Sequence, residues 1–333
     1  PLGVGETAIR KALETGQSGV RTVPQWVEAG WIIPFGGKVV DFDAKQYVKP
    51  RKSLKVMSRE TELGFSAAAM AWEAAQAAGG VDPERFGVIN GANMFCPEVP
   101  ELAAACHACD EDGNFAFERW GKTGMREIIP LWLLNYLPNM TPCHIGISLD
   151  ARGPTNSIVA GDTSALTALI EAVDTIDRGH ADLMIAGGNS SMLAWMDLLW
   201  HQGANLSRRS EHPEAASRPF EADRDGMVGG EGAAMFVLEK REHAEARGVK
   251  PLARVLGYGR RSENAAETLL PTGQAVRLAI DAALAAADLS PHDVGHVNAH
   301  GDGTVVNDRI EAQAIADRLG ETAVTAPKSF FGN

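Results

Sequence analysis

The chain has 333 residues, of which 45% are hydrophobic and 22% charged, and its formal net charge is −12. This length allows one large or two ordinary domains with a substantial core, and the composition is typical of a soluble globular protein. The acidic balance argues against general nucleic-acid binding, so an acidic partner would have to meet a local basic patch.

Membrane-spanning and disulfide-rich classes are also excluded. No apolar run reaches the roughly 18 residues of a spanning helix, and the longest candidate, IIPLWLLNYL at 128–137, contains a proline. Four cysteines do not form a disulfide framework, which favours the reducing cytoplasm. Because the chain begins at Pro1 rather than at methionine, we expect it to be a fragment.

The first charged feature is the basic run KPRKSLKVMSRE at 49–60, which brings together Lys49, Arg51, Lys52, Lys55 and Arg59. A run of this kind is most often a solvated helix face. The alternative is a docking patch for an acidic partner.

Apolar stretches bounded by glycine then alternate with longer helical patterns, which predicts a parallel sheet with crossover helices. The first such strand is ERFGVINGA at 84–92. The irregular segment 93–139 is rich in Trp, Pro and Met, and we expect an insertion that covers a site or an interface.

This insertion contains a CxxC motif, Cys106 to Cys109. A zinc site needs about four ligands, and the sequence has no second CxxC. The acidic residues at 110–112 disfavour thiolate formation. We therefore expect buried helix cysteines rather than a metal or redox site.

The clearest strand–turn–helix unit contains SIVAGDTSALTALIEAV at 157–173. Ser157 to Val159 ends a strand, and Thr163 to Arg178 is helical. Its predicted apolar face consists of Leu166, Leu169, Ile170, Val173 and Ile176. Asp162 lies in the turn between them, where α/β enzymes often hold a nucleophile. The ordinary role of an aspartate there is to cap the helix.

The remaining elements continue the α/β pattern. ADLMIAGG at 181–188 predicts a strand buried on both faces, and 233–248 predicts a strand followed by a charged helix. A helix is expected over 275–289, ahead of a strand unit at 292–304. The glycine-rich segment 218–239 lacks the GK[ST] ending of a phosphate loop, which excludes nucleotide binding there.

Two further candidate site residues lie near the C-terminus. His300, in VNAHGDGTVVND, follows a predicted strand, where α/β sheets bind ligands, and a structural histidine is an equal alternative. Lys328, in APKSFFGN at 326–333, is by its local pattern most often a surface lysine.

Taken in order, the blocks GPTNSIVAGDTSA, ADLMIAGG, RPFEADRDGMVGGEGA, VNAHGDGT and APKSFFGN resemble the β-ketoacyl-acyl carrier protein synthases, which elongate fatty acids and polyketides. The resemblance implies an α/β thiolase fold, a five-layered α-β-α-β-α sandwich of two similar halves. It places the first half at 1–245 and an incomplete second half at 246–333. It also implies that the family's first strand and a C-terminal stretch are lacking.

Elongating members use a cysteine, two histidines and a supporting lysine. The resemblance assigns these positions to Asp162, His300, Asn333 and Lys328, in which Asp162 replaces the cysteine and Asn333 the second histidine. An asparagine can still donate a hydrogen bond to an enolate oxygen. A carboxylate is a weak nucleophile towards a thioester, and its acyl product would be a reactive mixed anhydride.

The resemblance therefore predicts a non-condensing subunit similar to the chain-length factors of polyketide synthases. The alternative is an active enzyme of the same fold, a malonyl-carrier decarboxylase or an acyl thioester hydrolase that uses Asp162 and His300. A scaffolding homologue is a third reading. No cofactor or metal is implied.

The implied partners are an acyl carrier protein and a second ketosynthase chain, as a homodimer or as a heterodimer with a cysteine-bearing synthase. The strand at 181–191 is the predicted dimer contact. An acidic carrier protein is expected to dock at Lys52 and Lys55, with Arg208 and Arg209 as outlying support.

Overall fold

The computed structural model describes all residues except 78–80, 94–96, 98, 195–204 and 265–270. The chain divides into two compact units. The first, which we call the sheet unit, comprises 43–200 and 232–250. The second, which we call the loop-and-helix unit, comprises 1–42, 201–231 and 251–333. The two similar halves with a boundary at 245 remain a prediction.

The sheet unit is built on a four-stranded sheet with the order β6-β3-β7-β8. Its strands are β3 (Phe86–Ala92), β6 (Thr155–Ile158), β7 (Leu183–Ser191) and β8 (Glu231–Glu239). β3 pairs in parallel with both β6 and β7, which confirms the predicted parallel pairing. Every residue of β3 is buried, as expected for a strand covered on both faces.

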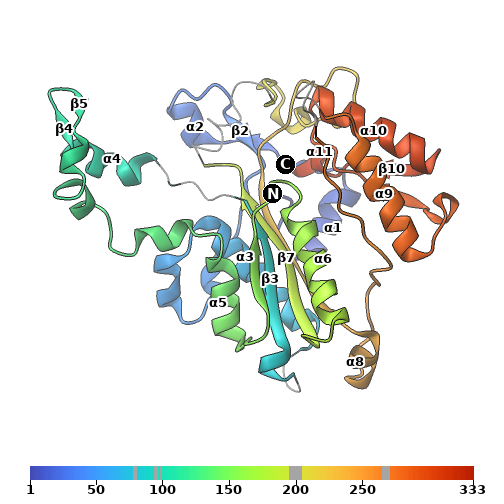
Figure 1. Ribbon diagram of the computed structural model, residues 1–333. Helices are drawn as coiled ribbons and strands as arrows, with labels where there is room; N and C mark the ends of the chain where they lie inside the picture. The colour runs from blue at the N-terminus through green and yellow to red at the C-terminus, as the bar shows by residue number, and fades with distance from the viewer. Residues whose placement is uncertain (78–80, 94–96, 98, 195–204, 265–270) are drawn as a thin grey trace. The chain divides into compact units, whose positions relative to one another are not determined.

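Helices cover both faces of this sheet (Figure 1). α6 (Ser164–Asp177) packs against β3 and β7, while α3 (Arg59–Ala74) and α5 (Met140–Leu149) pack together on the other face. α8 (Arg241–Ala246) follows β8. The helix predicted at 163–178 and the strand followed by a helix predicted within 233–248 are therefore confirmed.

The predicted apolar face of α6 is partly wrong. Leu166 is 66% exposed, whereas Ala168 and Ala172 are fully buried. The helix approaches the sheet so closely that a Cβ atom on Gly91 would lie 2.4 Å from the backbone nitrogen of Ala165. Only small side chains fit at such a distance, so alanines rather than leucines form the first part of the contact.

The strand order argues against edge-to-edge pairing as the predicted dimer contact through the strand at 181–191, and the contact itself stays a prediction. β7 lies between β3 and β8, so both edges of its backbone are already paired within the sheet. A strand can pair with another subunit only from an edge of the sheet. Among the strands of this sheet, β6 is an edge strand.

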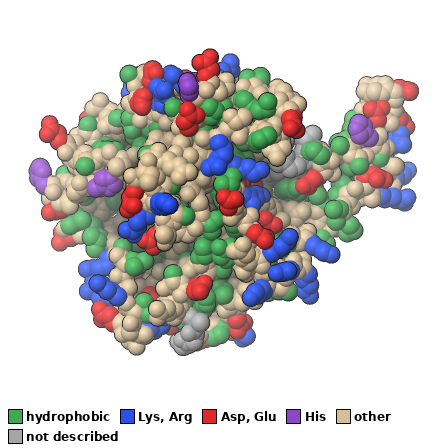
Figure 2. All heavy atoms as spheres, turned by 180° about the vertical axis from the view of Figure 1, so that it is seen from behind, with side chains coloured by type: hydrophobic (Ala, Val, Ile, Leu, Met, Phe, Trp, Pro, Cys, Tyr) green, Lys and Arg blue, Asp and Glu red, His purple; other side chains and the backbone are tan. Residues whose placement is uncertain are grey.

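The insertion contains α4 (Val99–Ala108) and a short hairpin of β4 (Asp110–Glu111) and β5 (Asn114–Phe115). Figure 2 shows apolar, acidic and basic side chains together on this projecting arm. Cys109 is buried, but Cys106 is exposed, so the prediction of two buried cysteines is half wrong. Ala105 in α4 and Cys109 just after it are both buried. Because they are four residues apart, they lie on the same side, which is the covered side of the helix.

The loop-and-helix unit contains two small sheets. β1 (Arg21–Thr22) pairs antiparallel with β2 (Phe35–Gly36), and β9 (His296–Asn298) pairs in parallel with β10 (Ala323–Thr325). Its helices are α1 (Glu6–Glu14), α2 (Pro24–Glu28), α9 (Gln274–Ala287), α10 (Val305–Leu319) and α11 (Lys328–Phe331). The predicted helix at 275–289 and the strand within 292–304 are confirmed by α9 and β9.

Glu263 fixes the start of α9. Its carboxylate accepts hydrogen bonds from the backbone N–H groups of Ala275, Thr272 and Gly273 and from the Thr272 hydroxyl. These bonds, that of Ala275 first, lower the pKa of Glu263 to about 2. The carboxylate thus supplies the partners that the first N–H groups of a helix lack.

Among the described residues, no helix combines the length and apolar character that crossing a membrane requires.

Candidate active site

Asp162 lies in the tight turn between β6 and α6, as the sequence predicts. Gly161 adopts a left-handed backbone with φ +59°, a conformation that glycine reaches without steric cost. Two neighbouring hydroxyls hold the turn: Thr163 Oγ1 donates to the carbonyl oxygen of Ala160 at 2.9 Å, and Ser164 Oγ donates to that of Gly161 at 2.6 Å. The turn therefore presents Asp162 from a fixed backbone.

The interpretation of Asp162 as the helix cap is wrong. The N-cap of α6 is Thr163, and its side chain makes no capping bond to the helix. Asp162 is exposed one position earlier. Ser164 and Thr163 supply the side-chain hydrogen bonds described above for this turn.

His300 and Lys328 come together in the loop-and-helix unit. His300 follows β9, and Lys328 opens α11, beyond the paired strand β10. Lys328 Nζ lies 2.9 Å from His300 Nδ1. The backbone N–H groups of His300 and Gly301 donate to the carboxylate of Glu311 at 2.6 and 2.9 Å, which fixes the loop that carries the imidazole.

Asn333 belongs to the same unit and is held by its backbone. Its N–H donates to Val228, and its carbonyl accepts from Gly230, both at 2.8 Å. Its side-chain nitrogen lies 3.8 Å from the sulfur of Met227. Asp162 belongs to the sheet unit, so a site that combines it with His300, Lys328 and Asn333 remains a prediction.

Sequence reasoning missed two buried acids that follow His300 in the block VNAHGDGTVVND, of which Asp302 lies beside its imidazole. Asp302 and Asp308 each have side chains only 1% exposed. Burial raises the pKa of Asp302, but hydrogen bonds from Asn307 and Thr304 outweigh it and lower the pKa overall. Burial raises the pKa of Asp308, and the neighbouring charge of Asp302 raises it further.

A cavity of about 260 Å³ opens beside these residues. It is lined by Asn205, Asp225, Gly226, Pro271, Thr304, Val305, Val306 and Asn307. Two of these, Thr304 and Asn307, bind the carboxylate of Asp302. Asp302 therefore lies directly behind two residues that line this cavity, and a small ligand could enter the cavity.

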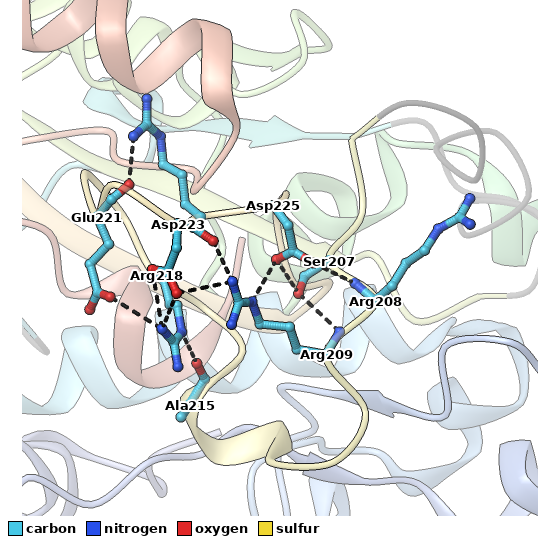
Figure 3. A network of polar contacts seen from close by, with 9 residues as sticks. Ser207, Arg208, Arg209, Ala215, Arg218, Glu221, Asp223 and Asp225 are labelled. Carbon is cyan, nitrogen blue, oxygen red and sulfur yellow. Dashed lines mark hydrogen bonds and ion pairs between the residues drawn. The ribbon is translucent and has the colours of Figure 1, made fainter.

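The predicted docking residues differ in how far they are engaged. Lys52 and Lys55 lie on an exposed 3-10 turn (Arg51–Val56). Arg209 forms ion pairs with Asp223 at 3.1 Å and with Asp225 at 3.4 Å, whereas the side chain of Arg208 points away from this network (Figure 3). The charge of Arg209 is therefore largely neutralised within its own loop, and docking at these positions stays a prediction.

Family models match nearly the whole chain. "Beta-ketoacyl synthase, N-terminal domain" covers residues 1–244, and "Beta-ketoacyl synthase, C-terminal domain" covers residues 252–333. The 3-oxoacyl-[acyl-carrier-protein] synthase 2 of Vibrio cholerae is 32% identical over 342 residues, which span 100% of this chain and 79% of the relative. A protein of the same name from Staphylococcus aureus is 29% identical over 96% of this chain and 75% of its own length.

Solved structures agree with these relatives. A β-ketoacyl synthase from Burkholderia phymatum superposes with a TM-score of 0.84 at 28% identity, covering 98% of this chain and 77% of its own. A type II polyketide ketosynthase in complex with its acyl carrier protein, AntDE:AntF, has a TM-score of 0.78 at 28% identity, with coverages of 100% and 79%. The ishigamide ketosynthase/chain length factor has a TM-score of 0.78 at 25% identity, with coverages of 99% and 78%.

The architecture is therefore the thiolase-like α/β fold of ketosynthases. The chain belongs to the β-ketoacyl synthase family.

Proposed function

We propose that this protein is a non-condensing, chain-length-factor-like subunit of a fatty-acid or polyketide synthase. The observation that carries the proposal is the aspartate at position 162, on the strand–turn–helix where the family resemblance places the acyl-accepting cysteine. A carboxylate attacks a thioester poorly, and the anhydride it would form is easily hydrolysed or reversed. Its negative charge also disfavours a malonyl carboxylate and an enolate nearby.

The cysteines of the chain do not offer a replacement within the turn. Cys106 and Cys109 belong to the inserted arm, and Cys143 lies in α5. Cys96 precedes all three and falls outside the described residues. The likeness to a ketosynthase/chain length factor supports a subunit that works beside an active partner.

A second candidate function is an active enzyme with altered chemistry, such as a malonyl-carrier decarboxylase or an acyl thioester hydrolase that uses Asp162 and His300. The observation in its favour is the contact of 2.9 Å between Lys328 and His300. A histidine held in this way can stabilise the negative charge that develops on the oxygen of a bound thioester during reaction. Such an enzyme would turn over substrate without a partner chain.

Turnover by the purified protein separates the two functions. We expect no release of carbon dioxide from malonyl carrier protein and no hydrolysis of acyl carrier protein above the rate without protein. We also expect a cysteine-bearing ketosynthase to co-purify from the native source. Catalytic turnover by this chain alone, abolished by His300→Ala, would establish the enzyme instead.

The proposed carrier-protein site is the exposed turn that carries Lys52 and Lys55. Reversing both charges, Lys52→Glu with Lys55→Glu, should weaken carrier-protein binding roughly tenfold and flatten its salt dependence, because an acidic partner loses two attractive contacts. Titration calorimetry at two salt concentrations measures both effects. Reversal of the exposed Lys240 and Lys250 is the charge-matched control, and equal weakening by both pairs would refute a local docking site.

We also propose that the protein acts in the cytoplasm as a dimer, either with itself or with a cysteine-bearing ketosynthase. The position of β6 supports this arrangement, because among the described strands it forms an edge of the sheet next to the turn of Asp162, and an edge strand can extend a sheet into a second subunit.

A further inference from the structure

The two ring nitrogens of His300 face groups of opposite charge. Lys328 Nζ lies 2.9 Å from Nδ1, and a carboxylate oxygen of Asp302, Oδ2, lies 3.8 Å from Nε2. The side chain of His300 is 35% exposed and that of Asp302 only 1%. A ligand can therefore contact the imidazole, whereas the buried carboxylate of Asp302 affects that ligand through its charge.

Asp302 is held in place by two hydrogen bonds. The backbone N–H of Thr304 donates to Oδ1 at 2.7 Å, and the side-chain amide of Asn307 donates to Oδ2 at 2.8 Å. Both bonds favour the ionised carboxylate. Because they also fix its position, the negative charge cannot swing away when a ligand binds.

The lysine determines which ring nitrogen can serve a ligand. A charged lysine has three donors and no acceptor, so it donates to Nδ1, and a neutral imidazole then carries its proton on Nε2. This N–H is the donor that His300 can offer to the carbonyl oxygen of a thioester. It lies on the side of the ring that faces Asp302.

The three charged groups placed against His300 and its backbone sum to one negative charge. Lys328 contributes one positive charge, whereas Asp302 and Glu311 contribute two negative charges, Glu311 through its bonds to the backbone of His300 and Gly301. A neutral acyl thioester meets no net repulsion there. A malonyl thioester whose carbonyl oxygen accepted from this donor would bring a second negative charge close to Asp302.

We propose that Asp302 determines substrate specificity at His300, admitting neutral acyl thioesters and disfavouring malonyl thioesters. The inference rests on the proposed function and deepens it, because it names a second residue, besides Asp162, that opposes the decarboxylation step. Asp302 acts through its charge on the ligand held by His300 and takes no part in bond making. Two like charges several ångströms apart near a protein surface shift affinity by about tenfold or more.

Binding of two thioesters that differ by one carboxylate group tests the inference. The full-length protein, with its partner chain if one co-purifies, is titrated with acetyl-coenzyme A and with malonyl-coenzyme A. We expect the natural protein to bind the acetyl thioester about tenfold more tightly. Asp302→Asn should remove most of this preference, chiefly by strengthening malonyl binding, because the amide has nearly the same shape without the charge. The amide can accept only one of the two hydrogen bonds that Thr304 and Asn307 donate to the carboxylate.

Asp288→Asn is the matched control, since it removes one negative charge from the exposed C-cap of α9, where Asn tolerates the left-handed backbone. The preference should be unaltered in this variant. Asp302→Thr serves as the second variant if Asp302→Asn unfolds, because its hydroxyl can still accept from Thr304, and it should also lose the preference.

Failure of the inference about Asp302 can be distinguished from failure of the proposed function. If the natural protein binds both thioesters and the preference is the same in the folded Asp302 variants, the inference is wrong and the proposed function stands. If the natural protein binds neither thioester, both the inference and the thioester site of the proposed function are overturned.

Discussion

Asp162→Cys is expected to gain a covalent acyl group from an acyl carrier protein, while the natural protein gains none. The new thiol would lie one residue before the N-cap of α6, a 14-residue helix. The positive end of a helix dipole lowers the pKa of a thiol and so increases the reactive thiolate. Intact-mass spectrometry should show one added acyl group per chain.

Two controls make the labelling result specific. Asp162→Asn removes the charge without adding a nucleophile and should stay unlabelled. The exposed Cys106 and Cys143 are present in every variant, so peptide mapping has to place the acyl group at position 162.

Each outcome of the labelling experiment has a separate meaning. Acylation of the natural protein at Asp162 would show that the carboxylate does hold the chain. An unlabelled Asp162→Cys variant would indicate a closed pocket and favour a scaffolding role. A labelled variant that fails to condense with malonyl carrier protein would locate the remaining deficit at the enolate donors, His300 and Asn333, or at the charge of Asp302.

Arg247→Met is expected to destabilise the sheet unit by about 3 kcal/mol. Arg247 binds both oxygens of Glu239, at 2.7 and 3.1 Å, and donates to the carbonyl oxygens of Ala75 and Gln76 beyond the end of α3. The side chains of this ion pair are only 12% and 10% exposed. Removing the arginine leaves a largely buried carboxylate without its main partner.

Chemical denaturation at pH 7 measures this effect. Arg178→Met is the matched control, because Arg178 is 71% exposed and lies 3.9 Å from Asp174 in an ordinary surface pair. Its effect should stay within about 0.5 kcal/mol. Equal losses in the two variants would show that burial of the Glu239 pair contributes nothing particular.

The same ion pair gives the protein a pH dependence of known sign. Burial raises the pKa of Glu239, but hydrogen bonds from Arg247 and His243 outweigh it, so the pKa lies below its ordinary value of 4.5. The resulting stabilisation is present above pH 4.5 and is lost as the pH falls through the lowered pKa. The difference between natural protein and Arg247→Met should therefore shrink in acid.

Much of the local structure follows from the sequence alone. The helix at 163–178 was predictable from the spacing of its apolar residues, and the strand at 181–188 from its short continuous apolar run. Both signals are properties of neighbours in the chain. The turn at Asp162 was predictable because glycine at 161 permits a left-handed backbone. The sequence also shows directly that the residue in this turn is an acid and not a thiol.

Only the tertiary structure decided how these elements meet. The order of strands places β7 inside the sheet, and the close approach of α6 buries Ala168 rather than Leu166. The pairing of β9 with β10 brings Lys328 to His300, and the loop after His300 turns back to bury Asp302 beside it. Sequence periodicity records which face of an element is apolar, but contacts between distant segments depend on strand order and packing distance, which the local pattern does not encode.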